Sequence, residues 1–224
     1  MTKKDDLLLS EQRLKMVLEG SGLGFWDWNI ETGEVIRNDR WAQMLGYSSI
    51  KEFENNTDTW TNFIHPDDRD AAWQSINNHI EGLTSAHNME YRMLTKDGNY
   101  KWILDHAKIV QFDANGKPVR MSGTHLDITR RKQIENELKY MASHDHLTGL
   151  YNRHLLTQQL HDEIKRALRY KHAISIFMLD IDHFKSINDT YGHCMGDSIL
   201  CDFAKVLESS IRNTDYDARY GGEE

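Results

Sequence analysis

An apolar run that ends in two carboxylates constrains this chain more than any other feature. Residues 173–179 read AISIFML, and Asp180 and Asp182 follow them directly. A short continuous apolar run is typical of a strand that is buried on both faces of a sheet. Two carboxylates at the end of such a strand need a cation or hydrogen-bond donors, because burying an unpaired charge is costly. A divalent metal ion would meet that need.

The residues after this run predict a short helix, a glycine turn and a longer helix. Gly192 is of the type that ends helices, and Asp197 stands where a carboxylate would help to start the next one. Residues 219–224 read RYGGEE, which predicts a glycine turn that carries Glu223 and Glu224. Two acidic segments that lie far apart in the sequence therefore stand out.

Composition narrows the class of protein. A chain of 224 residues suggests one or two domains, and its net charge of −8 argues against a nucleic-acid-binding protein, which usually has a basic face. No apolar run approaches the roughly 18 residues of a membrane helix, and acidic residues beside 7–9 argue against a signal peptide. Cys194 and Cys201 would lie about 10 Å apart on a helix, beyond the reach of a disulfide. We therefore expect two buried thiols and a reducing, cytoplasmic compartment.

The first half of the chain changes between helical and strand periodicity. Leu14, Val17 and Leu18 share one face of a predicted leading helix at 1–19. A hairpin at 25–36 and helical or irregular chain at 39–82 follow. Three strands are predicted at 87–94, 100–112 and 119–128, with turn residues at 97–98 and 115–116. This order predicts a small α+β domain around one antiparallel sheet.

This half resembles a PAS domain in four stretches: FWDWNIETG from Phe25, IHPDDR at 64–69, EYRMLTKDGNYKWI from Glu90, and LDITRRK at 126–132. The resemblance implies a sensor domain at 20–128, with a five-stranded antiparallel sheet and flanking helices. Such modules sense a ligand or a redox state, or serve only to dimerise, so the ligand is unknown.

The residues of this domain bear on the cofactors that it could hold. Photoactive flavin-binding relatives use a reactive cysteine, and both cysteines lie outside the domain, which disfavours that chemistry. A haem needs an axial ligand. Its histidines, which we expect to be surface or structural, are His65, His79, His87, His106 and His125. Its tryptophans, which we expect to belong to the core, are Trp26, Trp28, Trp41 and Trp102.

Residues 129–144 predict a helical linker. Ile134, Leu138 and Met141 follow heptad spacing among charged neighbours. So short a seam would be marginal as an isolated coiled coil. We interpret it as a continuous helix that couples a PAS homodimer to the next domain.

Residues 145–224 resemble the GGDEF family of diguanylate cyclases, in its GGEEF form. The resemblance rests on DHLTGLYNR at 145–153, on the segment 177–200 and on the terminal RYGGEE. It implies an α/β nucleotidyl-cyclase-like fold that is incomplete at its C-terminal side, because the signature stops before the expected Phe. It also implies condensation of two GTP molecules to cyclic di-GMP and two pyrophosphates in a homodimer. We expect this chain alone to be inactive.

The resemblance implies a metal and catalytic role for several residues. Asp180, Glu223 and the carbonyl of Ile181 would hold Mg²⁺ or Mn²⁺. Glu224 would orient a second ion or help to deprotonate the attacking hydroxyl, and which of the two glutamates is the base stays open. Lys185 would add positive charge beside the phosphates.

The resemblance also implies nucleotide-binding roles. The backbone N–H groups of His183 and Phe184, at a helix start, would receive phosphate oxygens. Asn188 and Asp197 would bind guanine, although Asp197 by itself also fits a helix N-cap. Residues 212–215 match the RxxD motif of the family's product-inhibition site, in which Arg212 and Asp215 would bind cyclic di-GMP. A solvated pair at a helix end is the alternative.

Two other functions are compatible with these residues. The second domain could bind GTP or cyclic di-GMP without turnover, although the intact Asp180, Glu223 and Glu224 disfavour this. Alternatively, the chain could serve only as a PAS sensory and dimerisation module.

Overall fold

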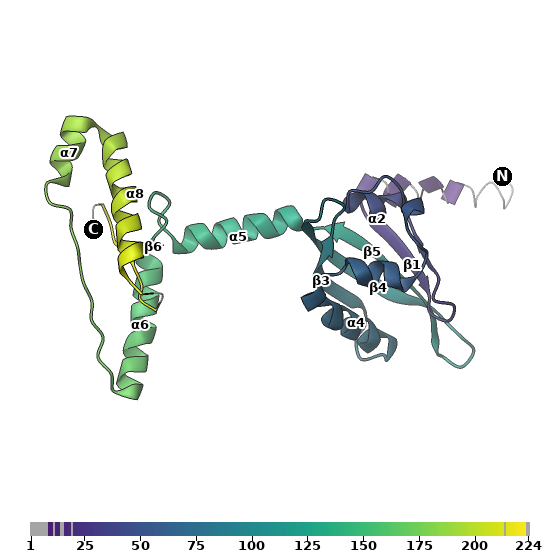
Figure 1. Cartoon of the computed structure of the whole chain (residues 1–224). Coiled ribbons are helices and arrows are strands. Elements are labelled where there is room, and N and C mark those ends of the chain that lie inside the picture. Colours follow the sequence, from purple (N-terminus) through teal and green to yellow (C-terminus); the bar gives the residue numbers. More distant parts are fainter. Residues whose placement is uncertain (1–8, 11, 14–15, 19, 213, 223–224) are drawn as a thin grey trace. The chain divides into compact units, whose positions relative to one another are not determined.

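The computed structural model describes residues 9–10, 12–13, 16–18, 20–212 and 214–222. It divides into two compact units, Met1–Lys132 and Gln133–Glu224 (Figure 1). The described residues between 9 and 21 are helical, and the rest of the predicted leading helix, including Leu14, lies outside the described residues. No helix in the described ranges is both long and apolar enough to cross a lipid bilayer.

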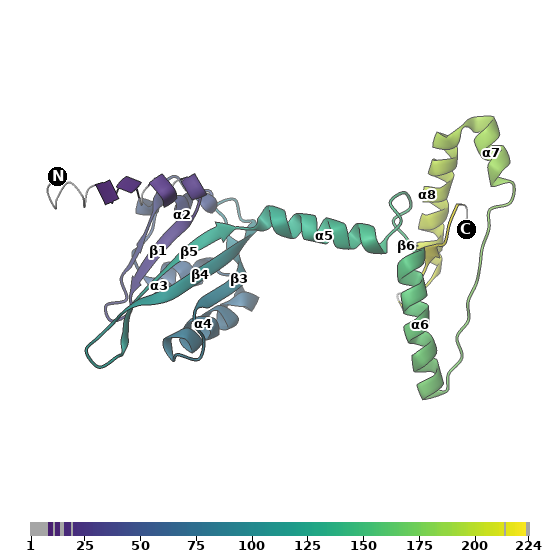
Figure 2. The same ribbon diagram turned by 180° about the vertical axis from the view of Figure 1, so that it is seen from behind.

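The first unit is built on one antiparallel sheet of five strands, in the order β2-β1-β5-β4-β3 (Figures 1 and 2). The strands are β1 (Gly24–Asn29), β2 (Val35–Arg37), β3 (His87–Leu94), β4 (Tyr100–Phe112) and β5 (Pro118–Asp127). β3 and β4 have the predicted bounds. Gly98 and Gly116, in the two predicted turns, have φ values of +83° and +81°, which glycine adopts without strain. The predicted α+β fold class is confirmed.

One face of the sheet carries the core. Ile103, Asp105 and Ala107 alternate with more exposed residues along β4, so the period of two aims them at the same face. The helices that pack there are α2 (Asp39–Met44), α3 (Thr57–Phe63) and α4 (Pro66–Ile80), joined by the 3₁₀ turn η1 (Ile50–Glu52). Trp26 and Trp41 are core residues as predicted, and Trp28 is partly buried against the core. The expectation for Trp102 is wrong, because its ring lies outside the core, under the cations of Arg92 and Lys132.

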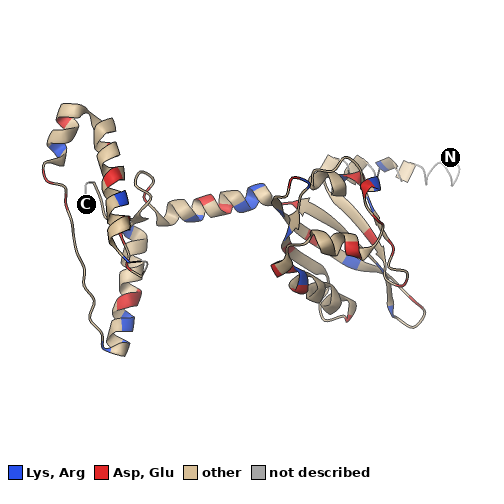
Figure 3. Ribbon diagram, viewed as in Figure 1, with Lys and Arg blue, Asp and Glu red and all other residues tan. Residues whose placement is uncertain are grey.

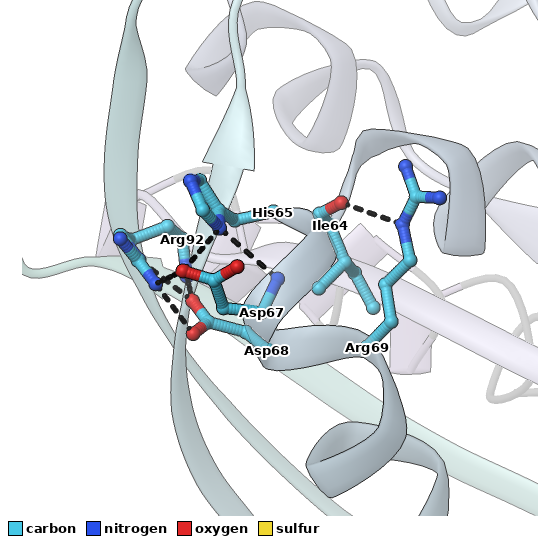
Figure 4. Close-up of polar contacts among 6 residues, drawn as sticks. All are labelled: Ile64, His65, Asp67, Asp68, Arg69 and Arg92. Carbon is cyan, nitrogen blue, oxygen red and sulfur yellow. Dashed lines mark hydrogen bonds and ion pairs between the residues drawn. The ribbon is translucent and has the colours of Figure 1, made fainter.

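The IHPDDR motif forms the start of α4 (Figure 4). His65 Nδ1 accepts a hydrogen bond from Asp67 N at 3.2 Å, and Pro66 occupies the first helical position. Asp68 accepts two hydrogen bonds from the Arg92 guanidinium, at 2.9 and 2.7 Å, and a third from Arg92 N at 3.0 Å. These contacts tie α4 to β3, and the hydrogen bonds from Arg92 hold the pKa of the Asp68 carboxyl below its usual value. The predicted structural role of His65 is confirmed.

Replacing Asp68 with alanine is expected to lower the free energy of unfolding by about 1.5–3 kcal/mol, because charge-assisted hydrogen bonds are lost at a partly buried site. Asp67→Ala is the matched control, since the Asp67 side chain is 75% exposed and should cost little. Because the folded pKa of Asp68 is depressed, its contribution exists above the unfolded pKa of about 3.9 and is lost as pH falls below it. Urea unfolding at pH 7 and pH 3 measures this, and equal losses in both variants would contradict it.

The second unit is mainly helical. Its elements are α5 (Thr129–Ser143), β6 (Tyr151–Asn152), α6 (Arg153–Tyr170), α7 (Phe184–Tyr191), α8 (His193–Ser210) and β7 (Ala218–Arg219), with α5 beginning in the first unit. α5 carries charges of both signs along its length (Figure 3). Ile134, Leu138 and Met141 are exposed on α5 of the single chain, and their pairing with a second copy stays a prediction.

Two expectations for the second unit differ from the structure. Residues 173–179 are extended and exposed rather than a buried strand, with Phe177 85% exposed. A buried strand needs hydrogen-bonded neighbours on both edges, and the described part of this unit offers only the short parallel pair of β6 and β7. Ile164 and Leu168 of α6 are exposed as well. Cys194 is also exposed, rather than a buried thiol.

Candidate functional site

The helix pair α7 and α8 carries most of the predicted site. Phe184, Gly196 and Leu200 are buried where the two helices pack together. Gly192, with φ +85°, ends α7 as predicted, and its N–H donates to the Asn188 carbonyl at 2.8 Å. Because Gly192 is also the residue before the first turn of α8, that helix begins at His193. Asp197 therefore lies in its second turn, and the expectation that Asp197 helps to start the helix is wrong.

The two predicted guanine-binding residues come from adjoining positions on these helices. A Cβ atom on Gly196 would lie only 2.0 Å from Asn188 Oδ1 and 3.2 Å from Phe184 Cζ. A larger residue at position 196 would therefore displace the Asn188 amide from its place against α8. This packing puts the amide beside the residue that precedes Asp197, so a base held by Asn188 would lie near the Asp197 backbone.

The predicted phosphate and metal residues form the turn that leads into α7. Asp180 and Asp182 are exposed at the end of the extended segment, and His183 has φ +59°. Phe184 N donates to the Ile181 carbonyl at 3.3 Å, so a predicted phosphate donor and a predicted metal ligand are paired with each other. Both would have to be released, at least in part, to bind a nucleotide and an ion. Lys185 is exposed on the first turn of α7.

The predicted metal ligands have the type of ligand atom that Mg²⁺ binds. Asp180 and the Ile181 carbonyl are oxygen donors, which Mg²⁺ prefers. Glu223 and Glu224, the predicted partners from the terminal turn, lie outside the described residues. Within the described residues, no three carboxylate, histidine or cysteine side chains gather as a metal site would require. Asp180 and the Ile181 carbonyl are therefore the oxygen ligands that the described residues offer to such an ion.

The predicted inhibitory pair forms the turn that leaves α8. Asp215 Oδ2 accepts a hydrogen bond from Arg212 N at 3.2 Å, and Asp215 N donates to the Arg212 carbonyl at 2.9 Å. Both side chains are exposed. This is the geometry of the solvated helix end that we named as the alternative, and binding of cyclic di-GMP by this pair stays a prediction.

One contact of the site was not anticipated from the sequence. Arg219 Nη1 lies 3.0 Å from Asp145 Oδ1, and Arg219 Nε donates to the Gly222 carbonyl at 2.8 Å. Asp145 Oδ1 also accepts from Thr148 N at 2.9 Å. Arg219 thus ties the start of the DHLTG motif to the glycine turn. In the sequence, Arg219 is visible only as an arginine two residues before the paired glycines. The pairing of β7 with β6 brings it to Asp145.

The two units together define a protein class: a sheet domain with a helix-covered core, followed by a helix and a unit that bears acidic and amide residues around a helix pair. Family models match both parts. Residues 34–125 match the PAS fold, and residues 142–224 match the GGDEF domain of diguanylate cyclases. The chain therefore belongs to the proteins in which a PAS domain precedes a GGDEF domain.

The chain is similar to several known proteins. The uncharacterized protein y4lL of Sinorhizobium fredii is 29% identical over 96% of this chain and 26% of its own length. Diguanylate cyclase DgcS of Shewanella oneidensis is 47% identical over 39% of this chain and 30% of its own length. The solved sensory box histidine kinase/response regulator of Burkholderia thailandensis is 31% identical, with a TM-score of 0.49, over 57% of this chain and 92% of that structure. The chain thus spans less than a third of these two curated relatives.

Proposed function

We propose that the protein to which this chain belongs is a PAS-regulated diguanylate cyclase, which condenses two GTP molecules to cyclic di-GMP. The observation that carries the proposal is the packing of α7 on α8, which seats the Asn188 amide against Gly196 and next to Asp197. The match of residues 142–224 to the GGDEF domain of diguanylate cyclases supports it. We take 20–128 as the sensor, 129–144 as the linker and 145–224 as part of the cyclase domain.

Guanine recognition follows from the chemistry of Asn188 and Asp197. Guanine presents an N1–H and an exocyclic amine as donors and O6 as an acceptor. A carboxylate accepts from the two donors, while an amide can donate to O6. Adenine has no N1–H. The Asp197 carboxylate would therefore lose one of the two hydrogen bonds that it accepts from guanine.

Phosphate binding and catalysis are assigned to the turn before α7 and to the terminal glutamates. The N–H groups of His183 and Phe184 stand at a helix start, where backbone donors favour anions, and Lys185 adds a charge. The Phe184 N–H becomes available once its bond to the Ile181 carbonyl opens. Asp180, the Ile181 carbonyl and Glu223 would hold Mg²⁺ or Mn²⁺, which when bound supplies positive charge to the phosphate oxygens. Glu223 or Glu224 would take the proton of the attacking hydroxyl.

The reaction needs two GTP-loaded domains. The 3′-oxygen of each ribose attacks the α-phosphate of the other nucleotide, forming a new P–O bond as the bond to pyrophosphate breaks. Each domain supplies one nucleotide, so a homodimer is part of the mechanism. Binding of cyclic di-GMP by Arg212 and Asp215 would inhibit the enzyme, because a guanidinium can contact phosphate and a carboxylate can accept from guanine.

The test compares the 224-residue chain with one that continues through the whole GGDEF domain, using GTP and Mg²⁺ with chromatographic detection of cyclic di-GMP. We expect turnover from the longer chain only, because residues 173–179 are exposed and unpaired in the structure described. GTP binding without product by the longer chain would favour a non-catalytic binding domain. Product from the 224-residue chain would contradict the expectation that it is inactive.

A further inference from the structure

The first unit buries an arginine that pairs with no carboxylate of the described residues. Arg37, at the end of β2, is 7% exposed, and within the described residues it makes no ion pair. Its guanidinium donates only to main-chain carbonyls, those of Glu54 at 3.4 Å and Asn56 at 2.8 Å, and lies 4.9 Å from the centre of the Trp41 ring. A buried charge without a counter-charge is costly, and burial lowers the pKa of Arg37 to about 10.

The carboxylate that lines the same cavity as Arg37 is already engaged. Asp105 accepts hydrogen bonds from Trp26 Nε1 at 2.9 Å and from the Tyr91 hydroxyl at 2.8 Å, and lies 3.0 Å from His125 Nε2. These contacts engage both oxygen atoms of Asp105 with other side chains. Within the described residues, no carboxylate pairs with Arg37.

Arg37 lines a small aromatic cavity. The cavity has a volume of about 30 Å³ and its walls include Trp26, Trp28, Trp41 and Trp60. Such a volume accommodates about one or two water molecules or a ligand with few heavy atoms, and is far smaller than the pockets that hold cofactors. As the structure stands, a haem or a flavin would not fit there.

Two residues that line this cavity each have a buried ring nitrogen without a hydrogen-bond partner among the described residues. Trp28 Nε1 and His125 Nδ1 are buried, and neither has a hydrogen-bond partner within the described residues. Both residues line the cavity beside Arg37. An indole N–H can only donate, so the missing partner of Trp28 is an acceptor. A cation would leave that donor unmet and would be repelled by Arg37.

We propose that this cavity binds a small monocarboxylate, with the carboxylate on Arg37 and Trp28 Nε1 and a short apolar tail between the tryptophan rings. A carboxylate supplies the missing counter-charge and has two acceptor oxygens, one for each donor. A neutral molecule of the same shape would supply the acceptor and leave the charge unmet. The proposal concerns the first unit and does not depend on cyclase activity.

Acetate titration of the full chain tests the proposal. Thermal unfolding is followed with sodium acetate, with sodium chloride at equal ionic strength, and with acetamide as the neutral molecule of the same shape. We expect a saturable rise in melting temperature with acetate alone. Arg37→Gln should weaken acetate binding about tenfold or more, because a charge-assisted hydrogen bond is lost. Arg40→Gln is the matched control, since Arg40 is exposed on α2, and should bind acetate normally.

A second measurement keeps the test decisive if Arg37→Gln does not fold. Trp28→Phe keeps an aromatic ring but removes the indole N–H, so it identifies the Trp28 indole signal in a ¹H–¹⁵N spectrum. That signal should move with acetate in the wild-type chain, and the variant should bind acetate several-fold more weakly. An unmoved Trp28 signal, equal stabilisation by chloride or acetamide, or wild-type affinity in Arg37→Gln would overturn the proposal.

Discussion

Asp105→Ala is expected to lower the free energy of unfolding of the first unit by about 3–5 kcal/mol, the cost of leaving buried donors around a deleted carboxylate. Asp105 is 1% exposed on β4, and four side chains meet its two oxygen atoms. They are Trp26, Tyr91, His87 and His125. Tyr91 also accepts a hydrogen bond from Trp60 Nε1 at 2.7 Å, so the deletion disturbs a connected network that reaches α3.

The same residue gives the unit a defined response to acid. Burial raises the pKa of the Asp105 carboxyl, but the charge of His125 and hydrogen bonds from His125 and His87 outweigh it, so the pKa lies well below its usual range. A depressed folded pKa means that Asp105 stabilises the fold above its unfolded pKa, about 3.9. That stabilisation is lost progressively as pH falls below this value.

Urea unfolding followed by tryptophan fluorescence measures both effects. Asp70→Ala is the matched control, because Asp70 is exposed on α4 and should cost little. Asp105→Asn keeps the shape of the side chain but cannot ionise. Its free energy of unfolding should therefore fall less steeply than that of the wild-type chain between pH 5 and 3, about one unit on either side of the pKa of an unfolded aspartate. A loss below about 1 kcal/mol for Asp105→Ala, or the same acid response in Asp105→Asn, would refute this account.

Asp180→Asn is expected to reduce cyclic di-GMP formation on the order of 10²–10³-fold in a chain that continues past Glu224, as removal of one charge-stabilising group does in a preorganised site. The amide keeps one oxygen donor and loses the charge that would hold a divalent ion. Because Asp180 is exposed at the end of an extended segment, the change should leave the melting temperature nearly unchanged.

Asp189→Asn provides the comparison, since Asp189 is an exposed carboxylate on α7 with no assigned role and the change has the same chemistry. Turnover is measured over a range of Mg²⁺ concentrations at saturating GTP. Turnover of Asp180→Asn equal to that of Asp189→Asn would exclude Asp180 as a metal ligand. A drop in the melting temperature of Asp180→Asn alone would assign the effect to folding instead.

Local patterns predicted the sheet of the first unit well. Alternating residues at 87–94 and 100–112, with Gly98 between them, specify a hairpin whose bounds the structure reproduces. Each of these signals acts between residues that are close in the sequence. The same logic identified Gly192 as the end of α7, although it misplaced Asp197, because a glycine that ends one helix can also precede the next directly.

Contacts between distant residues could not be predicted in this way. No local pattern marks Asp105 as a partner of Trp26, because the strand register of β1, β5 and β4 alone brings them together. The apolar run 173–179 has the composition of a buried strand, yet it is extended and exposed, because a strand depends on neighbours that lie elsewhere in the fold.

The amino-acid sequence by itself determined the order of the two domains, the β1 to β5 strands and the residue types of the candidate site. The tertiary structure alone decided which side chains share the core with Asp105, that Arg37 is buried with no carboxylate partner in the described part of the chain, and that Arg219 reaches Asp145. The physical reason is that periodicity and turn chemistry are local properties of the chain. Burial and charge pairing depend on the register between strands and on the packing of helices, which the whole chain sets.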